Sequence, residues 1–166
     1  LNIAKLGAVC NSWFADFYGE LRDGLNVGMP SDRFQVDWWV NSARVKKRLS
    51  KQPPKKLDLA HYLSAETPRL NETFLNDHGF ITPQPSGISE RFDSTEISPP
   101  LLLLEIPADF LELKSADPEL ALEWRSHTRK IFKTLFASGY IVTDFIYLSG
   151  SQPRSYYVLS FGESTL

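Results

Sequence analysis

The chain has 166 residues, a formal net charge of −2, 42% apolar residues and 13% aromatic residues. This length can hold one domain with a real core, and the composition is that of a globular protein and not of a disordered one. The charge balance predicts no general attraction to nucleic acid or to an anionic membrane. No apolar run approaches the roughly 18 residues of a membrane helix, since Leu101–Leu104 is too short. The single cysteine, Cys10, excludes an internal disulfide and a Cys-rich metal site.

The first stretch, residues 1–50, opens in what reads as the last turns of a helix that ends at Gly7. The chain lacks an initial Met, so we expect it to be the C-terminal part of a longer protein. An aromatic-rich strand is predicted from Cys10 to Tyr18. We expect Cys10 to be a buried structural thiol in a reducing, cytoplasmic compartment.

A second strand is predicted over Phe34–Val40, after turn signals at Asp23–Gly24 and Gly28–Pro30. Its side chains alternate with the two-residue period of a half-buried strand. This period places one set of residues on a buried face: Phe34, Val36 and Trp38. The opposite face carries Asp37 and Trp39. A short basic helix is then predicted over Ser42–Leu49.

The second stretch, residues 51–100, is rich in Pro, Ser, Thr and Asn. We expect a long surface connection with a little extended structure around Phe80–Ile81. A connection of this length is uncommon inside a compact domain, which indicates a boundary or a crossing segment.

The third stretch, residues 101–166, begins with a predicted buried strand at Leu101–Ile106 and a short helix at Ala108–Lys114. Asp117 and Pro118 are a strong start for a long helix that closes at Gly139. Its apolar positions recur at helical spacing: Leu120, Trp124, Thr128, Ile131 and Leu135, with Phe132 and Phe136 widening the stripe. Two strands forming a hairpin are predicted at the end: Ile141–Leu148 and Ser155–Phe161. The sequence thus predicts an α+β fold in which helices pack on a mixed or antiparallel sheet.

Several phrases of the sequence resemble those of a group of predicted acyltransferases with the GNAT fold, the fold of acyl-CoA N-acyltransferases. Lys5–Val9 resembles the end of the fourth helix of that fold. The longer phrases are Tyr18–Leu21, Gly24–Phe34, Asp37–Trp39, Ile106–Phe110, Ala121–Arg125 and Gly139–Phe145. The resemblance implies that residues 1–50 are the C-terminal helix and strands of a GNAT-like domain. Residues 51–100 then form a connecting segment, and residues 101–166 form an α/β extension.

The resemblance implies an N-acyltransferase that uses acetyl-CoA or another acyl-CoA as co-substrate, without a metal. That superfamily binds the pyrophosphate on a Gly-rich loop at a helix N-terminus, and this chain has no such loop. Many members protonate the leaving thiolate with a Tyr, and the corresponding position here is Ile3, which cannot transfer a proton. No catalytic residue can therefore be assigned, and we expect the chain alone to be inactive. The alternative is a non-catalytic ligand-binding or protein-interaction domain that retains a GNAT-like sheet.

The resemblance also implies that the last strands border an acceptor cleft for a small-molecule amine. Asp37 would then hold the amine, Trp39 would wall the cleft, and Tyr18 would donate a proton there. The competing interpretation is a surface Asp, a Trp packed under a loop and a sheet Tyr with a bonded hydroxyl. No nucleic-acid or membrane partner is predicted, and a homo-oligomer is compatible with this interpretation.

Other charged groups have mainly structural interpretations. A basic run could meet a phosphate of coenzyme A or of nucleic acid, although a solvated face is the default: Arg44, Lys46, Lys47, Arg48, Lys51, Lys55 and Lys56. His127 is expected to be a packing or interface residue, and no His has a partner at metal-ligand spacing. Arg125 and Arg129 are expected to pair with nearby acids such as Glu119 or Glu123, or with another subunit.

Overall fold

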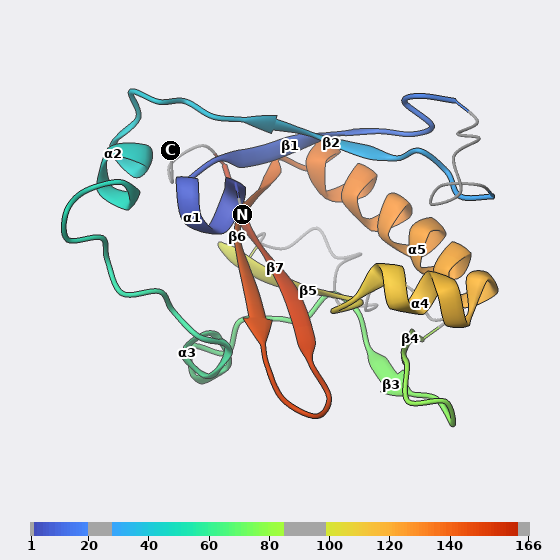
Figure 1. Cartoon of the computed structure of the whole chain (residues 1–166). Helices are drawn as coiled ribbons and strands as arrows, with labels where there is room; N and C mark the ends of the chain where they lie inside the picture. Colours follow the sequence, from blue (N-terminus) through green and yellow to red (C-terminus); the bar gives the residue numbers. More distant parts are fainter. Residues whose placement is uncertain (1, 20–27, 85–98, 163–166) are drawn as a thin grey trace.

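The computed structural model describes residues 2–19, 28–84 and 99–162. The fold is α+β, as the sequence predicts, and its elements are arranged around one five-stranded antiparallel sheet (Figure 1). The helices are α1 (Asn2–Leu6), α2 (Ala43–Arg48), α3 (Leu59–Ser64), α4 (Phe110–Ala116) and α5 (Pro118–Ala137). The strands are β1 (Val9–Phe14), β2 (Arg33–Asp37), β3 (Thr73–Leu75), β4 (Ile81–Pro83), β5 (Leu101–Ile106), β6 (Tyr140–Leu148) and β7 (Arg154–Phe161).

The main sheet has the strand order β2-β1-β6-β7-β5. The predicted terminal hairpin is confirmed, because β6 and β7 are antiparallel neighbours. Strand β1 joins this hairpin through the pair Cys10 and Val142. Residues from the first and third stretches of the chain therefore share one sheet, and β3 and β4 form a separate two-stranded sheet.

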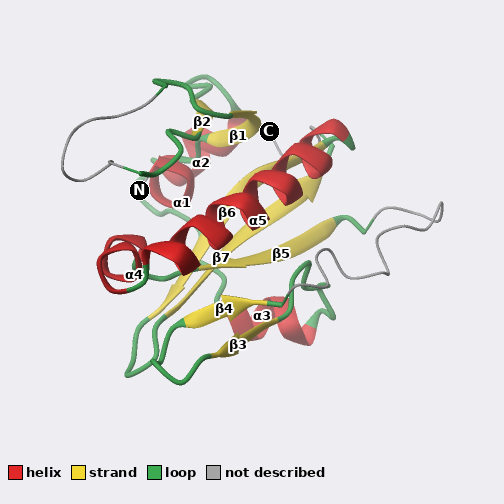
Figure 2. Ribbon diagram, turned by 90° about the vertical axis from the view of Figure 1, so that its right-hand side faces the viewer, coloured by secondary structure: helices red, strands yellow, loops and turns green. Residues whose placement is uncertain are grey.

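Helix α5 lies diagonally across one face of the main sheet (Figure 2). It begins where predicted, because Asp117 caps it through a bond from the Leu120 N–H to Asp117 Oδ1 (2.9 Å). The predicted apolar stripe is confirmed; its buried members are Leu120, Ala121, Trp124, Thr128, Ile131, Phe132 and Leu135. Its second half packs on the main sheet, whereas Leu120, Ala121 and Trp124 pack against α4 and β4. The helix ends before Gly139, whose φ of 88° suits glycine.

The opposite face of the sheet is covered in part by α3. Tyr62 of this helix is buried against Leu103, Ile146 and Val158. Neighbouring residues of a strand thus pack into different clusters, since Leu102 and Leu104 belong to the core under α5. Both faces of β5 and β7 are covered, which explains the nearly continuous apolar sequence of Leu101–Leu104.

Residues 51–100 carry more structure than the predicted connection. Helix α3 and strand β3 were not expected, whereas extended structure at Ile81 was. The segment is fixed to β5 by buried polar groups: Asn71 donates to Glu105 O (3.0 Å) and accepts from the Glu105 N–H (3.0 Å). Arg154 and Thr73 both donate to the carboxylate of Glu105. Local sequence gives no signal for these long-range bonds.

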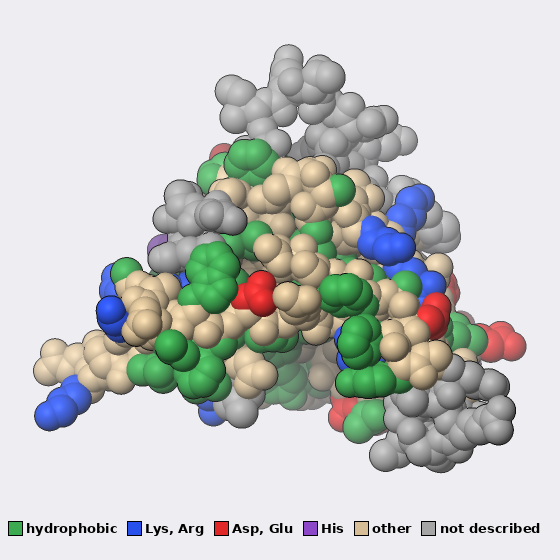
Figure 3. Space-filling view, turned by 90° about the horizontal axis from the view of Figure 1, so that it is seen from above, with side chains coloured by type: hydrophobic (Ala, Val, Ile, Leu, Met, Phe, Trp, Pro, Cys, Tyr) green, Lys and Arg blue, Asp and Glu red, His purple; other side chains and the backbone are tan. Residues whose placement is uncertain are grey.

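The predicted burial along residues 34–40 is only partly correct. The strand ends at Asp37, and Phe34 packs against the core. Val36 and Trp38 are 39% and 48% exposed, contrary to the prediction. The reason is that β2 is an edge strand, so α5 covers only its beginning. Hydrophobic side chains are visible at the surface in Figure 3, which views the molecule from the β1–β2 side.

Residue 7 must be a glycine because of its backbone conformation and the close approach of α2. This residue ends α1 with a φ of +76°, and an added Cβ would lie 3.3 Å from Val45 Cα and 3.2 Å from Arg48 Cγ. The predicted basic helix is confirmed as α2, with Ser42 at its N-cap. Arg48 then pairs with Asp144 at 2.5 Å, which fixes α2 to β6. The predicted turn at Asp23–Gly24 lies outside the described residues.

We expect Trp124→Ala to lower the free energy of unfolding by about 3–5 kcal/mol, because a buried aromatic side chain of this size leaves a cavity. Trp124 is 1% exposed, and its indole N–H also donates to Ile81 O at 2.8 Å. Leu122→Ala, on the same helix but 40% exposed, is the matched control and should cost far less. Chemical denaturation of both variants tests this. Equal midpoints for the two variants would show that α5 does not pack through Trp124.

Candidate functional site

A pocket of about 330 Å³ lies between the middle of α5 and the main sheet, next to the start of α4. Its lining comes from five parts of the chain: Trp13, Asp32, Arg33, Phe34, Ile106, Pro107, Phe110, Trp124, Arg125, Thr128, Phe132 and Tyr157. This volume is at the lower end of the range for small-molecule sites. We call it the aromatic pocket.

Aromatic rings form one side of the aromatic pocket and hold one another in place. Trp13 stacks on Phe132 with centroids 5.2 Å apart, and Phe34 meets Phe132 edge-on at 4.8 Å. Tyr157 is edge-on to Phe34 at 5.5 Å. Burial raises the pKa of Tyr157 to about 12, so its hydroxyl is protonated at neutral pH. These contacts give the pocket a rigid apolar wall.

A buried ion pair closes another side of the pocket. Asp32 has a fully buried side chain and accepts two bonds from Arg129, at Nε (2.8 Å) and Nη2 (2.5 Å). The N–H of Asp16 also donates to Asp32 at 3.1 Å. Burial raises the pKa of the Asp32 carboxyl, but these bonds outweigh it, so that the pKa lies below its ordinary value. Asp32 is therefore ionised, and both of its carboxylate oxygens accept hydrogen bonds from Arg129 or Asp16.

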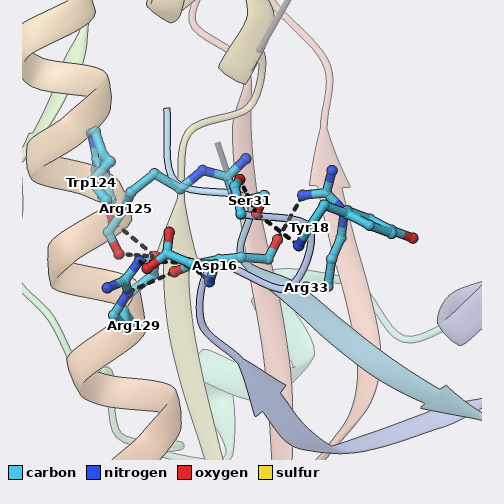
Figure 4. Close-up of polar contacts among 10 residues, drawn as sticks. Asp16, Tyr18, Ser31, Arg33, Trp124, Arg125 and Arg129 are labelled. Atoms are coloured by element: carbon cyan, nitrogen blue, oxygen red, sulfur yellow. Dashed lines mark hydrogen bonds and ion pairs between the residues drawn. The ribbon is translucent and has the colours of Figure 1, made fainter. Parts of the chain in front are cut away.

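The turn after β1 is fixed by Ser31, which is 1% exposed. Its hydroxyl accepts from the Tyr18 N–H (3.0 Å) and donates to Gly19 O (2.9 Å). Arg33 lies over the Tyr18 ring with its guanidinium carbon 5.3 Å from the ring centroid, and it donates to Asp32 O at 2.8 Å. Figure 4 shows these groups beside Asp16 and Arg129.

Arg125 differs from these neighbours because it makes no hydrogen bond or ion pair with any described residue. Its side chain extends from α5 toward the segment that carries Ser31 (Figure 4). The guanidinium lies over Phe110 with 4.3 Å from its carbon to the ring centroid, and its Nε is buried without an acceptor. Burial lowers the pKa of Arg125; the positive charges of Arg33 and Arg129 act in the same direction, while Asp32 opposes them. Even so, an arginine is protonated at neutral pH.

The three residues predicted to bind substrate do not come together. Tyr18 is 61% exposed in the turn after β1, whereas Asp37 is at the far end of β2, paired with Val9. Trp39 lies beyond the end of β2 and is 47% exposed. None of them lines the aromatic pocket, although Tyr18 borders a smaller hollow beside Arg33. Their role in binding stays a prediction.

The basic run lies on the other side of the sheet. Five of its members line a hollow of about 460 Å³, which we call the basic hollow: Arg44, Lys47, Arg48, Lys55 and Lys56. Asp144 also lines it and pairs with Arg48. Arg44 donates to the backbone oxygens of Gly7 and Thr143, so both arginines support the fold.

The remaining reactive groups have structural roles. Cys10 is fully buried, as predicted, and burial raises the pKa of its thiol to about 12, so the thiol is protonated at neutral pH. His127 packs edge-on against Trp124 and lies 3.3 Å from the Asn71 amide, which confirms a packing role. Among residues 2–19, 28–84 and 99–162, no group of acidic, His or Cys side chains could hold a metal ion. None of the described helices combines the length and apolar content that crossing a membrane requires.

No family model matches this chain, and neither the curated proteins nor the solved structures give a significant match.

Neither Arg125 nor Arg129 pairs with Glu119 or Glu123, so this part of the prediction is wrong, while pairing with another subunit stays a prediction. Arg129 pairs with Asp32 and, at 3.4 Å, with Asp16, residues that are distant in sequence, while Arg125 forms no ion pair with an acid of the described residues. Helical spacing places the two arginines one turn apart, but it gives no information on what lies opposite each. The sequence signal for this pocket lay in the phrases Gly24–Phe34, Ile106–Phe110 and Ala121–Arg125.

We expect Asp32→Asn to lower the free energy of unfolding at pH 7 by about 1.5–3 kcal/mol, because it removes the charge from two bonds to Arg129. The depressed pKa of Asp32 stabilises the fold above about pH 4, and this contribution disappears as the pH falls through the folded-state value. The variant should therefore lose less stability than the wild type between pH 5 and pH 2. Denaturant titrations across this range measure both effects.

Asp16→Asn is the control, because that side chain is 56% exposed and the substitution should change the stability by less than about 1 kcal/mol. A wild-type acid profile in Asp32→Asn would contradict this account of the ion pair.

Proposed function

We propose that this chain supplies the acceptor-binding pocket of an acyl-CoA-dependent N-acyltransferase. The observation that carries the proposal is the convergence of phrases that resemble that class of enzyme. Gly24–Phe34, Ile106–Phe110 and Ala121–Arg125 are far apart in sequence, yet together they contribute most of the residues that line the aromatic pocket.

The proposed reaction joins an amine to an acyl group. The amine nitrogen attacks the thioester carbonyl, the carbon–sulfur bond breaks, and the coenzyme A thiolate leaves. The amine proton passes to water or to a base, and the thiolate takes up a proton. Much of the rate enhancement comes from orienting the two reactants. A pocket with mutually packed walls, such as Trp13, Phe34 and Phe132, is suited to hold an acceptor in one orientation.

The co-substrate would be acetyl-CoA or another acyl-CoA, in the cytoplasm, with no metal required. The phosphates of coenzyme A need a separate binding surface, because the sequence of this chain has no Gly-rich loop like the one that binds them in the family it resembles. The basic hollow offers positive charge, but the sheet separates it from the aromatic pocket: its lining residue Val158 follows Tyr157, which faces α5. We therefore expect weak binding of acyl-CoA by these residues alone.

A non-catalytic ligand-binding domain is the second candidate, and two observations favour it. Ile3 is 8% exposed and belongs to the apolar core, so the position of the family's proton donor has no replacement there. Within the described lining of the aromatic pocket, the only carboxylate is that of Asp32, which Arg129 already engages. An acceptor amine bound there would lose its proton to water.

Turnover separates the two candidates. The protein expressed from its complete gene is mixed with acetyl-CoA and a panel of primary amines, and the released thiol is measured with a thiol reagent. An acyltransferase releases thiol in an amine-dependent manner. Phe34→Trp, which fills the pocket, should lower the rate at least tenfold, whereas Lys130→Gln on the exposed side of α5 should leave it unchanged. Ligand binding without any thiol release would support the second candidate.

We expect residues 1–166 alone to bind acetyl-CoA with a dissociation constant weaker than micromolar at physiological salt, because the sequence has no Gly-rich loop before a helix that would cradle the phosphates. Calorimetric titration measures this directly. Micromolar binding that is lost in a Lys55→Gln, Lys56→Gln variant would contradict the expectation and assign the phosphates to the basic hollow.

A further inference from the structure

We propose that the aromatic pocket binds a small organic acid, with its carboxylate on the guanidinium of Arg125 and its apolar body against the aromatic rings. This inference names the ligand class of the pocket in the proposed function and rests on that pocket being a ligand site. It begins from the unused hydrogen-bonding groups of the lining.

The unsatisfied groups in the pocket lining are hydrogen-bond donors. Nε of Arg125 and Nε1 of Trp13 are buried without an acceptor. The terminal nitrogens of Arg125 and the Tyr157 hydroxyl also have no partner among residues 2–19, 28–84 and 99–162. In contrast, the Thr128 hydroxyl is engaged, since it donates to Trp124 O at 2.8 Å. A ligand that satisfies this lining must accept hydrogen bonds.

The charge of the lining points in the same direction. Three arginines lie near Asp32, and two of them already bond to it. Arg129 donates to the carboxylate of Asp32, and Arg33 donates to the backbone oxygen of Asp32. Arg125 forms no direct ion pair with any described residue, although the negative charge of Asp32 acts on it from a longer distance. Burying a charge without a hydrogen-bonded partner costs free energy, and the contact with Phe110 leaves the N–H groups of Arg125 without acceptors among the described residues.

The shape of the site favours a carboxylate. The guanidinium carbon of Arg125 lies 4.3 Å from the centroid of the Phe110 ring, a contact that uses no N–H group and so leaves these donors for a planar acceptor. Arginine and carboxylate match in this geometry and form two parallel hydrogen bonds. A bare ammonium ion would meet the positive charge of Arg125 and find no free carboxylate, so an amine acceptor would need to carry an acidic group as well.

The rest of the pocket lining favours a ligand whose carboxylate is attached to an apolar group. Beyond Arg125, the pocket presents Phe34, Phe132, Ile106 and Pro107, which offer apolar contact without hydrogen-bonding side chains. An inorganic anion would leave this surface uncovered. A carboxylate attached to a ring or a branched aliphatic group would cover it and would fit a volume of about 330 Å³.

The test compares three probes of one shape: 3-phenylpropanoate, its neutral amide 3-phenylpropanamide and the cation 3-phenylpropylamine. Binding to the full chain is measured by calorimetry and by ligand-observed NMR, without acyl-CoA and without turnover. The carboxylate should bind at least tenfold more tightly than either of the others. Inorganic phosphate at equal concentration should not displace it.

Arg125→Gln should weaken binding of the carboxylate at least tenfold and leave binding of the amide unchanged. Lys130→Gln removes an equal charge from an exposed position of the same helix and should change carboxylate binding less than twofold. Arg125→Met retains the apolar contact with Phe110 and provides a second readout. Because it removes an unpaired charge, its thermal midpoint should equal or exceed that of the wild type.

Three results would overturn the proposal: carboxylate affinity that is unchanged in Arg125→Gln, equal affinity of the wild type for acid and amide, or no binding of the acid at 10 mM. Displacement by phosphate would show an anion site without selectivity for organic acids. Since only binding is measured, a failure of the acyltransferase proposal would leave a positive result here intact.

Discussion

The packing of α5 across the antiparallel sheet is the constraint on which the rest of the structure depends. Ile131, Phe132 and Leu135 lie in one core with residues of β1, β5, β6 and β7. At the other end of the helix, Trp124 packs with Phe80 and Ile81, which links the middle of the chain to the same helix. Burial of this stripe therefore holds together segments that the sequence separates by more than a hundred residues.

The aromatic pocket lies along this helix, between its two packing regions. Phe132 faces the sheet core and Trp124 faces α4 and β4, and the residues between them, Arg125 and Thr128, line the opening. The pocket is thus built from a rigid helix and rigid strands, which is the arrangement that holds a site in a defined geometry. The Asp32–Arg129 pair adds a fixed link between α5 and the segment that leads into β2.

Local sequence patterns predicted the third stretch well, because each element carries its own signal. Asp117, Pro118 and Gly139 mark the ends of α5, and the terminal hairpin follows from its alternating apolar residues. The exposure of Val36 and Trp38 could not be predicted in this way, since periodicity indicates which residues share a face but not whether another element covers that face. The attachment of residues 69–83 depends on Glu105 and Asn71, whose pairing spans more than thirty residues.

The pocket could be predicted only in part, for a similar reason. Arg125 and Arg129 occupy equivalent positions one helical turn apart, and the sequence suggests the same role for both. Their difference arises from the opposite surface, where Asp32 is within reach of Arg129, while Arg125 lies over Phe110. Three arginines lie near Asp32 in the folded chain, but only Arg129 and Arg33 bond to it, which leaves the guanidinium of Arg125 as a hydrogen-bond donor in the pocket lining.

A crystal structure of the chain grown with 3-phenylpropanoate tests the central claim most directly. The account predicts the carboxylate oxygens at about 2.7–2.9 Å from the guanidinium nitrogens of Arg125, with the phenyl ring against Phe34 and Phe132. Occupancy of the basic hollow at Arg44 and Lys47, with the aromatic pocket empty, would contradict it.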